Sequence, residues 1–139
     1  MTLIIFAITL LSLFLVGATV FTHSGKAICT NRLKGSGTEP NYVAWGTGAG
    51  TAAVTDTTLF TEASESRVSG TSTQQTTTQT NDTYQVVGTL TCAGSGKTIT
   101  NAGLFDASTA GNLLLKGDFT GVVLGVGESI QFTLKLQFT

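Results

Sequence analysis

Charge is scarce in this sequence. Seven Lys and Arg residues and eight Asp and Glu residues make up 11% of its 139 residues, whereas a soluble domain usually carries about 25%. Nucleic-acid binding needs a basic patch, which so few cations do not supply. We therefore expect no nucleic-acid partner. Thr, Ser, Gln, Asn and Gly take the place of charge, and short neutral side chains cost less than ions to bury between subunits.

Residues that carry catalysis or hold metals are equally few. His23 is the single histidine, and Cys29 and Cys92 are the two cysteines, without the C-x-x-C or Cys/His spacing of a zinc site. Two free, buried thiols are the simpler interpretation, and one disulfide is the alternative for an exported chain. We expect no catalytic residue, no cofactor and no metal site, and we predict that the protein is not an enzyme.

One short motif is similar to the end of a phosphate-binding loop. Residues 94–98 read GSGKT, but Thr91 stands where that pattern requires a glycine. The residues that follow predict a strand, not the helix whose N-terminus would hold a phosphate. We interpret the motif as a hairpin turn.

An uncharged, apolar run opens the chain. Residues 2–22 contain no charge, and Lys26 is the first charged side chain. The run is long enough to cross a bilayer as a helix, whereas a cleaved signal peptide fits less well because no basic residue precedes it. A buried arm paired with another chain is a third alternative, because β-branched residues are frequent in the run. We predict an apolar arm or membrane-type segment at residues 1–23 and a separate body at residues 24–139.

The body has the pattern of β-strands. Over residues 129–139, apolar side chains alternate with Gln, Thr and Lys without a break, which indicates a strand with one buried face. Further strand candidates lie at residues 42–45, 83–92, 97–105 and 112–120, separated by glycine-rich turns such as the one before residue 112.

Helix signals are few. Residues 24–33 predict a short helix that Ser24 caps and that ends before Gly35, and residues 56–63 predict a helical turn with Asp56 as its N-cap. The elements together predict an all-β fold. We expect an antiparallel β-sandwich or jelly-roll-like body, with an N-terminal apolar arm or helix and at most one or two short helices.

Three parts of the chain are candidates for contacts with partners. The apolar prefix is one. The second is the aromatic pair in residues 42–45, which either packs in the core or contacts a sugar or a partner subunit. The third is the polar run at residues 66–79, which we interpret as a solvated edge strand, a strand buried among subunits or a mobile loop. The candidate interface residues are Ile4, Ile5, Phe6, Leu10, Phe14, Tyr42, Trp45, Gln74 and Gln75.

Six blocks of sequence follow one another along the body. They are residues 25–35 (GKAICTNRLKG), 42–48 (YVAWGTG), 56–59 (DTTL), 81–88 (NDTYQVVG), 99–106 (ITNAGLFD) and 127–132 (GESIQF). With these blocks the body resembles a family of small virion proteins of tailed bacteriophages, described as tail-fibre-like or head decoration proteins. The resemblance implies a β-sandwich or jelly-roll subunit that forms a homotrimer or another symmetric oligomer.

The resemblance leaves several functions open. The leading hypothesis is a capsid decoration or cement subunit, which stabilises the shell through many weak contacts with its own copies and the major capsid protein. The alternative is a tail-fibre or baseplate module that binds tail proteins and contacts the host surface. A membrane-anchored or secreted bacterial β domain is a third hypothesis, which the apolar prefix alone supports. The expected location is the virion, at the capsid surface or the tail, with membrane association left open.

Overall fold

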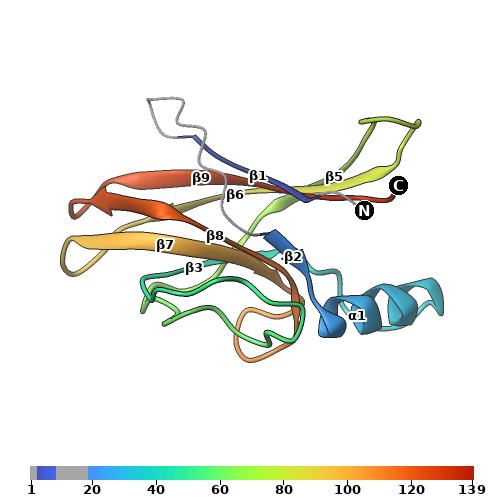
Figure 1. The fold of residues 1–139 in the computed structure, drawn as a ribbon, viewed down its shortest axis with the longest axis horizontal. Coiled ribbons are helices and arrows are strands. Elements are labelled where there is room, and N and C mark those ends of the chain that lie inside the picture. Colours follow the sequence, from blue (N-terminus) through green and yellow to red (C-terminus); the bar gives the residue numbers. More distant parts are fainter. Residues whose placement is uncertain (1–2, 9–18) are drawn as a thin grey trace.

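The computed structural model describes residues 3–8 and 19–139. These residues form two antiparallel sheets packed face to face, with one helix at one end (Figure 1). The strands are β1 (Leu3–Ile8), β2 (Thr19–Phe21), β3 (Tyr42–Gly46), β4 (Val68–Ser69), β5 (Thr71–Gln75), β6 (Thr83–Thr91), β7 (Lys97–Phe105), β8 (Leu113–Leu124) and β9 (Ser129–Gln137), and the helix is α1 (His23–Leu33). The first sheet has the order β1-β9-β6-β5 and the second β2-β8-β7-β3-β4. The predicted all-β sandwich is confirmed.

The core lies between the two sheets. In β9 the alternation predicted from the sequence is confirmed, because Ile130, Phe132, Leu134 and Leu136 are all buried. Trp45 of the opposite sheet stands edge-on to Phe132, with the ring centroids 6.3 Å apart. Alternate residues of facing strands therefore fill the space between the sheets, as in other sandwiches.

The segment between β3 and β4, residues 47–67, packs against the second sheet on the side away from this core. Leu59 of the segment is buried in a smaller cluster with Ala44, Phe105 and Leu113. The second sheet is thus covered on both faces, by the first sheet on one side and by this segment on the other.

The helical turn predicted for residues 56–63 is wrong. The stretch contains turns and an isolated bridge but no helix. Asp56 does not cap a helix, because its carboxylate accepts hydrogen bonds from the backbone N–H of Ala53 at 3.0 Å and from the Lys116 ammonium at 2.9 Å. Lys116 lies 60 residues further along the chain, so local sequence could not reveal this partner.

The helix predicted at residues 24–33 is confirmed, but its cap is a different residue. α1 begins one residue earlier, and Thr22 is its N-cap, accepting a hydrogen bond from the backbone N–H of Gly25 at 2.9 Å. Ser24 instead donates to the Leu113 carbonyl at 2.8 Å, which ties the helix to β8. Gly35 follows the helix with a φ of 85°, a conformation that glycine adopts without strain.

The polar run at residues 66–79 supplies an edge strand to each sheet, so it forms strands, as two of the three interpretations predicted. Burial of these strands among subunits stays a prediction. β4 is the edge of the second sheet and β5 the edge of the first, with Gly70 between them. The GSGKT motif lies in a turn between β6 and β7, where Gly94 has a φ of 74°. The turn was predicted correctly, but the hairpin was wrong, because β6 and β7 belong to different sheets and do not pair.

The N-terminal segment contributes strands. β1 pairs with β9, and β2 pairs with β8, both antiparallel. In the part of the chain that the structure describes, no helix is long and apolar enough to cross a membrane. The division of the chain into an arm at residues 1–23 and a body at residues 24–139 stays a prediction. β2 precedes residue 23, yet it pairs with β8 of the sandwich.

Both cysteines are free thiols, with Cys92 buried and Cys29 half-buried.

Candidate contact surface

Over β5, β6 and β9, the outer face of the first sheet is composed almost entirely of neutral polar side chains. In β5, β6 and β9 the residues that alternate with the core residues point to this face, and the strand register places them in rows, such as Thr73 beside Gln85 and Thr89 beside Gln131. No helix or strand of the described residues covers it. We call it the polar face, and its members are Thr71, Thr73, Gln75, Gln85, Val87, Thr89, Thr91, Ser129, Gln131, Thr133 and Lys135.

Hydrogen bonds between neighbouring side chains order the polar face. Thr91 and Ser129 share a hydrogen bond between their hydroxyl groups at 2.7 Å. The Gln75 amide donates to the Thr73 hydroxyl at 2.9 Å, and the Gln131 amide donates to Thr89 at 3.5 Å. Each hydroxyl and amide keeps further donor or acceptor capacity. The face therefore offers a regular array of neutral hydrogen-bonding groups.

The tip that joins β5 to β6 is held by one carboxylate. Asp82 accepts hydrogen bonds from the backbone N–H groups of Thr77, Thr78 and Gln79, each at 2.9 Å, and from the Gln137 amide at 3.0 Å. These hydrogen bonds, first among them the one from the backbone N–H of Gln79, hold the pKa of Asp82 well below its usual range. In Figure 1 the hairpin extends beyond the rest of the sheet.

Two of the candidate interface residues lie in β5. Gln75 belongs to the polar face, and Gln74 is its neighbour in the strand. Tyr42 is half-buried against the smaller cluster under segment 47–67. Trp45 is 1% exposed and its indole N–H donates to Glu65 at 3.2 Å, so it packs in the core, the other alternative that the sequence allowed.

The remaining candidates lie in the N-terminal segment. Ile4, Ile5 and Phe6 are in β1, where the register places them opposite Lys135, Leu134 and Thr133. Leu10 and Phe14 lie outside the described residues. For all of these residues, a role in contacts stays a prediction.

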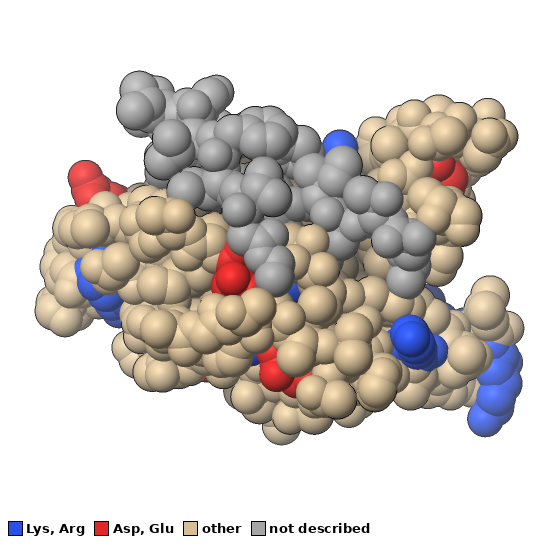
Figure 2. All heavy atoms as spheres, viewed as in Figure 1, with Lys and Arg blue, Asp and Glu red and all other residues tan. Residues whose placement is uncertain are grey.

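Charged side chains serve mainly to fasten segment 47–67. Its acids Asp56, Glu62 and Glu65 bind Lys116, Arg67 and Lys97, respectively. The guanidinium of Arg67 also lies 3.5 Å from the centre of the Phe105 ring, an arrangement typical of a cation–π contact. Figure 2 shows Lys, Arg, Asp and Glu scattered over one side of the molecule, with no broad patch of either sign.

Glu65 is the most strongly perturbed of these acids. Burial favours its neutral form, but hydrogen bonds from Lys97, the backbone N–H of Ala93 and the Trp45 indole outweigh burial and lower the pKa of Glu65 to about 2. The carboxylate thus stays ionised at neutral pH and joins segment 47–67 to the core and to the turn before β7.

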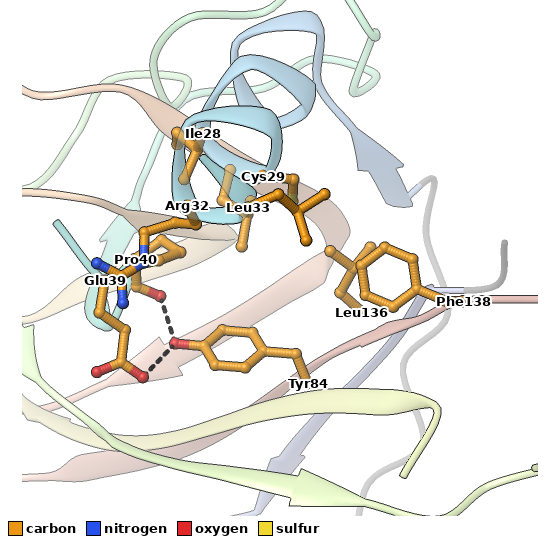
Figure 3. Close-up of a pocket in the computed structure, with 10 residues that line it drawn as sticks. Ile28, Cys29, Arg32, Leu33, Glu39, Pro40, Tyr84, Leu136 and Phe138 are labelled. Atoms are coloured by element: carbon orange, nitrogen blue, oxygen red, sulfur yellow. Dashed lines mark hydrogen bonds between the residues drawn. The ribbon is translucent and has the colours of Figure 1, made fainter. Parts of the chain in front are cut away.

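An apolar groove of about 580 Å³ opens between α1 and the ends of β6 and β9 (Figure 3). Leu33 and Phe138 line this groove, and their exposed fractions are 88% and 54%, respectively. At the polar end the Tyr84 hydroxyl donates to the Pro40 carbonyl at 3.1 Å and to Glu39 at 3.2 Å. Burial, followed by the negative charge of Glu39, raises the pKa of Tyr84.

The groove also contains the half-buried Cys29, and burial raises the pKa of its thiol. A thiol with a raised pKa is a poor nucleophile at neutral pH. Within residues 3–8 and 19–139, no group of three or more His, Cys, Asp or Glu side chains is placed to hold a metal ion.

The described residues thus form a two-sheet sandwich in which β5, β6 and β9 carry a neutral polar face. The model of a family described as podophage GP4 fiber I protein gp80 matches residues 26–134, from α1 into β9. The chain belongs to this family, and it is a structural, tail-fibre-like protein of a phage virion. No curated protein and no solved structure matches it.

The family match confirms the resemblance inferred from the six sequence blocks. The match begins at residue 26, so β1 and β2 lie outside it. The polar run at residues 66–79 was a predicted contact candidate, but the polar-face residues of β6 and β9, including Thr89 and Gln131, were not predicted. The signal for these residues was present, because the alternation that placed Ile130 and Phe132 inside also placed Gln131 outside.

Proposed function

We propose that the protein is a tail-fibre subunit that contacts the host-cell surface with its polar face and the adjoining β5–β6 tip. The observation that carries this proposal is the asymmetry of the sandwich. Segment 47–67 covers the second sheet, whereas the first sheet presents neutral hydrogen-bonding side chains without a described element above them. The description of the family, which names a fibre, supports the tail over the head.

The chemistry of the polar face suits repeated, weak contacts. Hydroxyl and amide groups can exchange hydrogen bonds with water for hydrogen bonds with a polar surface at a low desolvation cost. Each contact contributes little, but several subunits that bind together raise the total affinity. The ordered tip adds to this effect, because groups that are already fixed lose less entropy on binding.

The position of the protein in the particle tests the fibre proposal against the capsid decoration hypothesis. Gold-labelled antibodies against the protein should bind purified particles at the tail, in a few copies. Labelling distributed over the whole head would contradict the proposal and support decoration instead.

A competition experiment tests the polar face itself. Purified protein added to host cells should reduce the adsorption of phage, and Thr89→Arg should remove this effect because it places a long charged side chain in the centre of the face. Val123→Arg is the matched control, since Val123 is 76% exposed on β8 of the other sheet. Equal competition by both variants would show that the polar face does not bind the host.

A further inference from the structure

We propose that the free edge of β5 pairs with β5 of a second copy of this chain, antiparallel and across a twofold axis, so that the first sheets of two subunits join into one. This inference goes beyond the proposed function, because the pairing assembles subunits whatever surface the fibre binds. It also assigns an assembly role to the strand that contains Gln74 and Gln75.

The first observation is that β5 has a partner on one side alone. β6 pairs with all five positions from Thr71 to Gln75, without a bulge, and β5 ends the strand order of the described sheet. One edge of its backbone is therefore left with N–H and C=O groups that no strand of the described chain pairs.

The second observation is that this edge lacks protection. Soluble proteins protect their edge strands with lysine or other charges, proline, bulges or very short strands. β5 reads TSTQQ and has none of the first three, and it is longer than β4, the two-residue edge of the other sheet on the same side. An unprotected edge of this kind is a template for strand addition.

The third observation is that β5 is complementary to itself. Antiparallel pairing centred on Thr73 places Thr71 opposite Gln75 of the second copy and Ser72 opposite Gln74. Each pair joins uncharged hydrogen-bonding side chains, so pairing brings no like charges together. A twofold contact needs such self-complementarity, because the same patch is used by both copies.

The fourth observation is that β5 is fixed at both ends before any partner arrives. Asp82 fixes the tip after the strand through three backbone hydrogen bonds, and Gly70 before it donates its backbone N–H to the Asn41 carbonyl at 2.8 Å. Pairing also makes the polar faces of the two copies continuous, which doubles the area of neutral side chains on one side of the dimer.

Charge reversal at the centre of the strand tests the inference. The full-length protein should be dimeric in sedimentation over a dilution series. Thr73→Lys and Thr73→Glu should each be monomeric, because each places two like charges opposite one another at the twofold axis. A mixture of the two variants should recover the dimer, because the charges then attract.

The control is Thr89→Lys, which adds the same charge to the same face but on the central strand β6. It should leave the dimer unchanged, and circular dichroism should show that all variants keep their β structure. A monomeric wild-type protein, a dimeric Thr73→Lys variant or a mixture that stays monomeric would each overturn the inference. Host adsorption is not measured here, so the outcome is independent of the proposed function.

Discussion

Thr22 illustrates how single buried polar residues connect the elements of this protein. Its side chain is fully buried, and its hydroxyl oxygen accepts from the backbone N–H of Gly25 while the hydroxyl donates to the Leu113 carbonyl. One side chain thus caps α1 and fixes it to β8. Removal of such a group leaves buried partners without hydrogen bonds, which costs more than the bonds themselves contribute.

We therefore predict that Thr22→Val lowers the free energy of unfolding by about 2 kcal/mol, although valine keeps the shape of threonine. Thr30→Val is the matched control, because Thr30 lies exposed on the same helix and bonds only to the Ala27 carbonyl. Its effect should stay within about 0.5 kcal/mol. Urea unfolding of both variants measures the difference, and equal effects would contradict the role given to Thr22.

Glu65 provides a prediction about pH. Its pKa in the folded protein, about 2, lies below the ordinary value of 4.5, so the unfolded chain binds the proton more tightly. The stability that Glu65 contributes is then fully present above pH 4.5 and is lost as the pH falls toward 2. Glu65→Gln should destabilise the protein by about 1–3 kcal/mol at pH 7.

The same substitution should reduce the loss of stability between pH 5 and pH 3, which urea unfolding at the two pH values measures. Lys97→Met is the companion variant, because it removes the main partner of Glu65. It should shift the acid-induced loss of stability to higher pH. An unchanged pH profile in Glu65→Gln would show that other acids dominate.

At the scale of elements, the contact between α1 and the second sheet depends on a glycine. A Cβ atom at Gly25 would lie 2.1 Å from the Leu114 carbonyl oxygen and 2.9 Å from the Phe21 ring. The backbone of the helix can therefore approach β8 only where a side chain is absent.

Gly25→Ala should destabilise the protein by about 1–3 kcal/mol through overpacking, which exceeds the gain of up to about 1 kcal/mol that alanine brings to a helix. Gly125→Ala is the control, because the nearest atom to its Cβ would be Glu128 Oε2 at 3.5 Å. It should cause no loss. A stabilised Gly25→Ala variant in thermal unfolding would contradict the close contact.

The elements that the sequence predicted are those whose signals are local. Alternation identified β9, and glycine-rich stretches identified the turn at residues 94–98 and the hairpin around residues 106–111. The apolar run before residue 22 has no alternation, so helix and strand could not be distinguished there. The wrong helical turn at residues 56–63 has a different cause, since Asp56 is fixed by Lys116 of a distant strand.

At the scale of the whole molecule, β1 closes the edge of the first sheet that lies opposite β5. Removal of residues 1–8 should leave the sandwich folded, because the family match begins at residue 26. It should also expose the edge of β9 and cause association that increases with concentration. Size-exclusion chromatography measures this, with removal of residues 1–2 as the control. A truncated protein without a cooperative unfolding transition would show that β1 is needed for folding.

The contact surface could be predicted from the sequence only in part. Gln74 and Gln75 were found because they lie in a run without apolar residues. The rest of the polar face is shared among three strands that are distant in sequence, and only the pairing of β5, β6 and β9 makes it continuous. Segment 47–67 covers one sheet and leaves the other open, which is likewise a property of the assembled molecule. Two of its acids, Asp56 and Glu65, bind Lys116 of β8 and Lys97 of β7.

The passage of one short segment from β4 to β5 has a mechanical consequence. The chain leaves one layer of the sandwich and enters the other at Gly70, where a Cβ would lie 2.5 Å from a methyl group of Val86. Under tension the two layers cannot slide apart until this crossing is stretched and hydrogen bonds in both layers break. A force that slides one layer over the other is therefore shared by both layers at once.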